Sequence, residues 1–311
     1  MIGTGLIQST LGRNASSEPL LNRLEISDRT LKWLFLLPSV LILAFLALYP
    51  FFMAIFMSLH EWSLAGQGQQ WVGAANYAAL LGEDRFRSSL RNTAVFTGVS
   101  VTVELVLGVG LALYLRSLTK KWRPILRTIF IVPMVMTPIA TALLWRFMLN
   151  SDFGVVNWFL ANVLGLSPPA WTSTPTMAMA TLIMIDVWQW TPLIIMIVFA
   201  GLLSVPETYY EAAKVDGAGR LAIFRHITLP SIKYMIAIAV VFRLMRSFRS
   251  FDIIWLVTQG GPGTSTEILN VYLYRVAFRN LQGGKAAAMG LVLLVITIAV
   301  TMGILRATGV D

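Results

Sequence analysis

Hydrophobic residues gather into six long stretches, which are separated by shorter segments rich in polar and charged residues. A helix needs about 20 apolar residues to cross the hydrocarbon core of a bilayer, and each stretch reaches that length. The pattern therefore predicts an all-α, polytopic membrane protein with six transmembrane helices. The predicted spans are 33–59, 93–115, 128–149, 176–203, 234–258 and 286–305.

Composition agrees with this pattern. The chain has 311 residues, of which 57% are hydrophobic and 13% are charged. A soluble domain has about a quarter of its residues charged, so this chain has roughly half the usual share. Prolines within the spans, such as Pro133, Pro138 and Pro192, predict kinks, which membrane helices tolerate when neighbouring helices satisfy the freed carbonyls. No apolar core of signal-peptide length precedes Leu31, so we expect the first span to remain as a membrane helix.

The distribution of Lys and Arg predicts the orientation of the spans. With the N-terminus in the cytoplasm, fourteen Lys and Arg residues fall on the inner side and six on the outer side. This excess of Lys and Arg on one side predicts that the N- and C-termini both lie in the cytoplasm. Residues 1–30 then form a cytoplasmic tail, residues 31–311 form the transmembrane domain, and the polar segment 204–230 faces the cytoplasm. The net charge of +9 is explained by membrane flanks, and we expect no nucleic-acid partner.

Several kinds of chemistry are excluded by residue counts. Without cysteine the chain has no disulfide, no thiolate metal site and no Cys nucleophile. Two histidines, His60 and His226, are too few for a metal cluster. The only Gly-Lys pair, Gly284-Lys285, lacks the first Gly and the Ser/Thr of a nucleotide-binding P-loop. We therefore expect no catalytic residues, no bound metal and no cofactor on this chain.

The segment between the fourth and fifth spans carries a specific motif. Glu211-Ala212-Ala213 is followed after three residues by Gly217, and after nine more by Ile227-x-Leu229-Pro230. A short interfacial helix that caps the bundle would explain an amphipathic segment here. The order and spacing nevertheless resemble the EAA loop of binding-protein-dependent ABC importer permeases. We expect Gly217 and Gly219 to allow a tight turn between two short helices, and Pro230 to start the next helix.

That resemblance implies a fold and a set of partners. The fold is the type I ABC importer (MetI/MalF-like) transmembrane domain, with the EAA loop docked in a cleft on a cytoplasmic ATPase subunit. ATP and Mg²⁺ are then used by a homodimeric ABC ATPase and not by this chain. The residues that the resemblance assigns to this coupling are Glu211, Ala212, Ala213, Asp216, Gly217, Ala218, Ile227, Leu229 and Pro230.

Two further stretches narrow the resemblance. The run from Phe251 to Gly263, which ends in Gly-Gly-Pro-Gly, and Val72-Gly73-Ala74-Ala75-Asn76-Tyr77 are similar to carbohydrate-uptake permeases of the MalF/UgpA/SugA type. This implies an importer of a sugar, a polyol or a sugar derivative in a bacterial cell (inner) membrane. It also implies a second, MalG-like permease subunit, an extracytoplasmic solute-binding protein and surrounding membrane lipid.

Polar residues within the fourth and fifth spans are candidates for the substrate pathway, because ionisable groups are costly in a membrane. Their i, i+3, i+4, i+7 spacing predicts one helix face on each span, with Trp190 as an aromatic platform for a sugar. Arg243 and Arg249 could instead pair with Asp252, Asp186 or Glu104 to hold the bundle. Arg246, an additional cation on the cavity face, suggests that the substrate is an anionic sugar derivative, although neutral sugars are the commoner substrates. The candidates are Asp186, Gln189, Trp190, Leu193, Arg243, Arg246, Ser247 and Ser250.

Two other functional classes are possible for a polytopic membrane protein, and the sequence favours neither. An ion-coupled secondary transporter would show internal repeats, and we find no similarity between the two halves. A polytopic membrane glycosyl-transfer enzyme would need acidic or histidine-rich motifs at the membrane interface, and the sequence has none. ATPase activity that appears only with a co-purified subunit would favour the permease, whereas uptake driven by an ion gradient would favour the secondary transporter.

Overall fold

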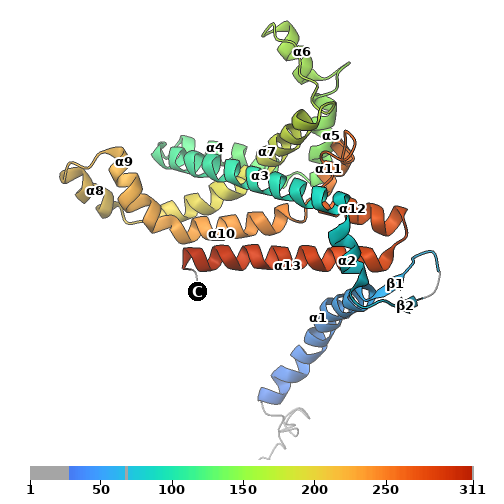
Figure 1. Ribbon diagram of the computed structural model, residues 1–311. Helices are drawn as coiled ribbons and strands as arrows, with labels where there is room; N and C mark the ends of the chain where they lie inside the picture. The colour runs from blue at the N-terminus through green and yellow to red at the C-terminus, as the bar shows by residue number, and fades with distance from the viewer. Residues whose placement is uncertain (1–27, 67–68, 310–311) are drawn as a thin grey trace, which may run out of the picture. The chain divides into compact units, whose positions relative to one another are not determined.

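A computed structural model describes residues 28–66 and 69–309 (Figure 1). The predicted tail, residues 1–30, lies outside this part of the chain except for its last three residues. The chain divides into two compact units, residues 1–53 and 54–311. In the described part of the chain, five helices are long and apolar enough to cross a membrane, or six if one bent pair counts as one span. This agrees with the predicted number of spans.

The helix α1 (Asp28–Ser58) makes up the described part of the first unit and extends into the second. Pro38 and Pro50 lie inside this uninterrupted helix. Its side chains from Lys32 to Pro50 are almost all exposed within this chain and almost all apolar. Such a surface fits contact with lipid or with another membrane helix.

The core of the second unit is a bundle of α3 (Asp84–Ser117), α7 (Pro175–Ser204), α10 (Leu229–Ser247) and α13 (Gly283–Thr308). Helices α3 and α7 share the most extensive contact, α7 also packs on α10, and α10 packs on α13. Gly108 lets α3 and α7 approach closely, because a Cβ atom there would lie 2.6 Å from Cγ2 of Ile194. The second, fourth and sixth predicted spans are confirmed as α3, α7 and α13.

The third predicted span, 128–149, was wrong as a single segment. It is divided between α4 (Trp122–Val135) and α5 (Pro138–Met148), whose axes differ by 96°. Met136 ends the first helix in extended backbone, and Thr137 caps the second, since its hydroxyl accepts from the Ala140 amide at 3.3 Å. Pro138 then occupies the first turn, where its missing N–H costs nothing.

The fifth predicted span, 234–258, was wrong at both ends. The helix α10 stops at Ser247, and α11 (Asp252–Val257) follows after a break. The Asn270 side chain holds the break open by donating to the carbonyls of Phe248 (2.8 Å) and Ser250 (3.0 Å). Upstream, helical backbone runs from Arg220 through α9 (Arg220–Ile223) and the π-helical turn η2 (Phe224–Thr228) into α10.

Short elements connect these helices. A two-stranded antiparallel hairpin pairs β1 with β2 and sets His60 opposite Trp71, which adds a small sheet to the predicted all-α fold. Helix α5 packs against α11 at the same end of the bundle as α12. The remaining elements are β1 (His60–Trp62), β2 (Gln69–Trp71), α2 (Ala75–Gly82), α6 (Val155–Asn162), α8 (Glu207–Val215), α12 (Leu269–Tyr274) and η3 (Arg275–Arg279).

Candidate functional site

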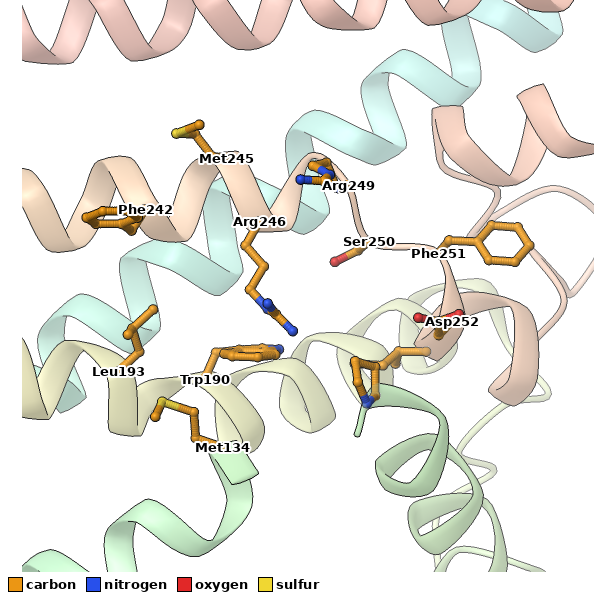
Figure 2. Close-up of a pocket in the computed structure, with 12 residues that line it drawn as sticks. Met134, Trp190, Leu193, Phe242, Met245, Arg246, Arg249, Ser250, Phe251 and Asp252 are labelled. Carbon is orange, nitrogen blue, oxygen red and sulfur yellow. The ribbon is translucent and has the colours of Figure 1, made fainter. Parts of the chain in front are cut away.

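A cavity of about 760 Å³ opens beside the break that follows α10 (Figure 2). Its walls come from α7, from the α4–α5 bend and from the end of α10 through the start of α11. Both breaks in the predicted spans therefore shape it. The lining residues are Met134, Pro138, Trp190, Leu193, Phe242, Met245, Arg246, Arg249, Ser250, Phe251, Asp252 and Ile253.

Arg246 lies directly on the Trp190 ring within this cavity. Its Cζ atom is 3.4 Å from the ring centroid, and Figure 2 shows the side chain reaching from α10 down to the indole. Trp190 belongs to α7, and its residue surface is only 8% exposed. The expected open aromatic platform is therefore covered, and the indole supports the guanidinium instead.

Arg243, one turn earlier on α10, points into the bundle and forms a triad with two carboxylates. Its guanidinium donates to both oxygens of Glu104 on α3, with Nη2 2.8 Å from Oε1, and it also donates to Asp186 on α7. All three side chains are 0% exposed. One positive charge thus faces two carboxylates in the core, which leaves an excess of one negative charge when both are ionised.

The eight candidate pathway residues separate into two groups. Trp190, Leu193, Arg246 and Ser250 line the cavity. The other four are buried in helix contacts and do not line the cavity. Besides Arg243 and Asp186 in the triad, Gln189 donates to the Met136 carbonyl at 3.0 Å, and Ser247 donates to Thr97 at 3.0 Å.

The segment 204–230 projects from the end of the bundle as two short helices (Figure 1). The predicted turn between them is confirmed, because Gly217 has φ +76° and separates α8 from α9. Gly219 has an ordinary φ of −71°, so it was wrongly expected to need glycine's freedom. Pro230 lies in the first turn of α10, as expected, and helical backbone already leads into that turn from the π-helical turn η2.

Side chains of this segment divide between contact with the bundle and exposure. Tyr210 and Ala213 are buried, while Glu211 and Asp216 are exposed. Two apolar residues are also strongly exposed, Val215 at 87% and Leu221 at 78%. The segment therefore presents apolar and acidic groups together to its surroundings.

A second polar network lies at the end of the bundle opposite α8 and α9 (Figure 1). Glu83, before α3, accepts from Lys285 on α13 and from the Tyr272 hydroxyl at 2.6 Å. Burial raises the pKa of the Glu83 carboxyl, but the hydrogen bonds from Lys285 and Tyr272 outweigh burial and hold it below its usual value. Burial and the bond to Glu83 raise the pKa of Tyr272.

Glu267 is the centre of a charged clamp in the same region. Its buried carboxylate receives Arg85 Nε at 2.7 Å and Arg275 Nη1 at 2.7 Å. The clamp ties the loop that contains Gly260-Gly261-Pro262-Gly263 to α3 and η3. Charge-assisted contacts of this kind hold a loop in one conformation.

A family model described as "Binding-protein-dependent transport system inner membrane component" matches residues 104–306, which is more than half of the chain. The chain belongs to this family. As a permease of the ABC transporter class it is a component of a transport system, and its several apolar helices make it a multi-pass membrane protein.

Similar proteins extend over nearly the whole permease. A trehalose/maltose transport system permease protein, MalF of Thermococcus litoralis, is 32% identical over 92% of this chain and 96% of its own length. A sulfoquinovosyl glycerol transport system permease protein, SmoG of Agrobacterium fabrum, is 32% identical over 91% of this chain and 92% of its own. A bacterial ABC transporter for import of the acidic polysaccharide alginate has a chain of TM-score 0.79 and 25% identity, covering 91% of this chain and 96% of that one. The type I importer fold of the permease is thereby confirmed.

Sequence reasoning missed several cavity residues of the permease. Arg249 lies in the break after α10 and Asp252 begins α11, and a continuous helix would not bring them to one wall with Trp190. Met134 and Pro138 face the cavity because α4 and α5 bend. The Thr137-Pro138 pair, a capping residue followed by proline, was the available signal for that bend.

Proposed function

We propose that this permease subunit forms half of the translocation pathway of an ATP-driven importer of sugars or sugar derivatives, and that it is coupled to a cytoplasmic ATPase through segment 204–230. The observation that carries this proposal is the projecting pair α8 and α9, which is anchored to the bundle on one side and exposes apolar and acidic groups on the other. Membership of the permease family and the cavity between α7 and α10 also support this proposal.

The coupling surface has the composition of a docking site. Val215 and Leu221 together expose two large aliphatic side chains beside the acids Glu211 and Asp216. Apolar groups ringed by charge are typical of protein contacts, where burial supplies affinity and charge supplies orientation. A cleft with an apolar floor and a basic rim on an ATPase would complement this surface.

Contacts between α8 and the end of α3 allow movement of the docking surface to reach the membrane helices. Arg116, at the end of α3, is 2.9 Å from Glu207 and covers the Tyr210 ring at 3.9 Å. Displacement of α8 by a bound ATPase is then carried directly to α3, and the helical backbone from Arg220 carries it to α10. Both helices border the cavity or its supporting triad.

Sugar is the proposed cargo because relatives along almost the full chain carry sugar names, trehalose/maltose and sulfoquinovosyl glycerol among them. The alginate importer shares the fold. The cavity of this chain has donors in Arg246, Arg249 and Ser250 and an acceptor in Asp252. These groups suit a hydroxyl-rich solute.

The proposed complex contains a MalG-like second permease subunit, an ABC ATPase homodimer that uses ATP and Mg²⁺, and an extracytoplasmic solute-binding protein. ATP binding closes the ATPase dimer, draws the two EAA loops together and opens the cavity outward, and hydrolysis resets it. Both termini and segment 204–230 lie in the cytoplasm in this arrangement. The chain itself binds no nucleotide.

Purification through a tag on this chain from its native membrane tests the coupling. We expect an ATPase subunit to co-purify, and Glu211→Lys or Gly217→Val to reduce its recovery while the permease remains membrane-inserted. Lys121→Glu is the matched control, because it reverses an exposed charge at the same end of the bundle. Normal ATPase recovery with both loop variants would refute docking at this segment. Uptake that survives ATP depletion and collapses with the ion gradient would point to a secondary transporter instead.

A further inference from the structure

Arg246 differs from Arg243 in how its charge is balanced. Arg243 is fully buried and bonded to two carboxylates. Arg246 has no carboxylate within ion-pair distance among the residues that the structure describes, and its guanidinium lies on the Trp190 ring. A positively charged side chain in a membrane-spanning helix is energetically costly, so it usually pairs with another charged or polar group or has a function such as ligand binding. Its donors are turned to the cavity and are left for something that enters it.

The buried triad explains how the Arg246 charge is tolerated without a direct partner. Arg243, Glu104 and Asp186 carry an excess of one negative charge behind the Trp190 ring, whose centroid is 6.0 Å from Arg243. Attraction over this longer path stabilises the Arg246 cation but uses none of its N–H groups. The cavity wall itself keeps two cations, Arg246 and Arg249, against the single carboxylate of Asp252.

The indole also fixes the guanidinium in place. Trp190 is 8% exposed and rigidly packed, and the guanidinium stacked on it at 3.4 Å has lost much of its rotational freedom. A stacked guanidinium keeps its edge donors free, and two of them match the oxygens of a planar or tetrahedral oxyanion. Because the side chain is already ordered, binding such a group costs little further entropy.

We infer that this cavity selects a sugar derivative carrying one negative charge, a carboxylate or a sulfonate, and that Arg246 on its Trp190 support is the residue that binds the anionic group. The inference rests on the proposed function. A neutral hydroxyl can accept one hydrogen bond from Arg246, whereas an anionic group can accept two from its guanidinium and pairs directly with a cation, which makes each bond stronger.

The test uses the whole importer, isolated through a tag on this chain and reconstituted in proteoliposomes with its binding protein. The probes are galacturonate and the sulfonate 6-deoxy-6-sulfoglucose, which carry one negative charge each, and they are compared with the uncharged sugars galactose and glucose. Uptake and substrate-stimulated ATP hydrolysis are measured for wild type, Arg246→Gln, Arg246→Lys and the control Arg127→Gln. Arg127 is an exposed cation on α4 outside the cavity, so its replacement removes the same charge elsewhere.

We expect wild type to transport at least one charged probe in preference to its neutral counterpart. Arg246→Gln should lower uptake of that probe roughly ten- to hundredfold. Arg246→Lys should keep part of it because the charge remains but the fork geometry is lost, and Arg127→Gln should match wild type. Transport of the neutral sugars alone, or charged-probe uptake unaffected by Arg246→Gln, would overturn the inference and leave the proposed function intact. If no sugar stimulates the assembled complex, the proposed function fails and the inference fails with it.

Discussion

The guanidinium of Arg116 covers the ring of Tyr210, with its Cζ atom 3.9 Å from the ring centroid. Arg116 stands in the last turn of α3, and Tyr210 is a buried residue of α8. The same guanidinium reaches Glu207 at 2.9 Å. One side chain thus joins the end of a membrane helix to the projecting segment at two points.

Arg116→Ala should loosen this joint without unfolding the bundle. The cation–π contact is worth about 1 kcal/mol, and the bridge adds little because Glu207 is 68% exposed. We expect roughly fivefold weaker ATPase retention in a co-purification titration. Ser117→Ala, at the neighbouring exposed position, serves as the control. Unchanged ATPase retention with Arg116→Ala would show that α8 is held by its other contacts.

The buried triad predicts a large stability effect that depends on how it is broken. Arg243→Met leaves Glu104 and Asp186 buried without a counter-charge, which costs about 3–5 kcal/mol. Replacing all three together, with Glu104→Met and Asp186→Leu added, should recover most of that loss. Thermal unfolding of the detergent-solubilised permease measures both. Equal melting temperatures for Arg243→Met and wild type would contradict a charged triad.

The close crossing of α3 and α7 predicts opposite outcomes at two glycines of one helix. Gly108→Ala places a methyl 2.6 Å from Ile194 Cγ2 and should destabilise the permease by about 1–3 kcal/mol. Gly110→Ala meets nothing within 4 Å and should be neutral or slightly stabilising. Thermal unfolding again gives the comparison. The crossing described here would be wrong if the two variants behaved alike.

The depressed pKa of Glu83 predicts a loss of stability in acid. A carboxyl whose pKa is lower in the folded state stabilises the fold above its usual value of 4.5, and the contribution disappears as the pH falls through the folded-state pKa. Wild type should therefore lose melting temperature below about pH 4.5 more steeply than Glu83→Gln. At pH 7 the wild type should be the more stable. Parallel pH profiles for the two proteins would exclude this contribution.

The pattern of hydrophobic residues predicted most of the fold, because each membrane span is long and its apolar character can be seen in that segment alone. Only one of the two errors in the spans occurred where a distant residue decides the backbone. The break after Ser247 is held by the amide of Asn270, which belongs to a different element. Thr137 and Pro138 are a local signal for the bend, but a proline kink in one span is an equally ordinary interpretation.

The candidate site was predictable as a set of polar residues but not in its division of roles. Arg243 and Arg246 are three residues apart on one helix and have the same chemistry. Glu104 lies 139 residues from Arg243, and only the crossing of α3, α7 and α10 brings its carboxylate to that one arginine. What separates a structural charge from a ligand-binding charge is therefore tertiary packing.

The triad joins α3, α7 and α10 at a point that water does not reach. Pulling any of these helices away would strand a lone charge in an apolar interior, at a cost of several kcal/mol. The three helices must therefore move as one rigid body when the cavity switches between opening to the outside and opening to the cytoplasm. The relative movement is left to the non-helical joints, which are the turn between α4 and α5 and residues 248–251.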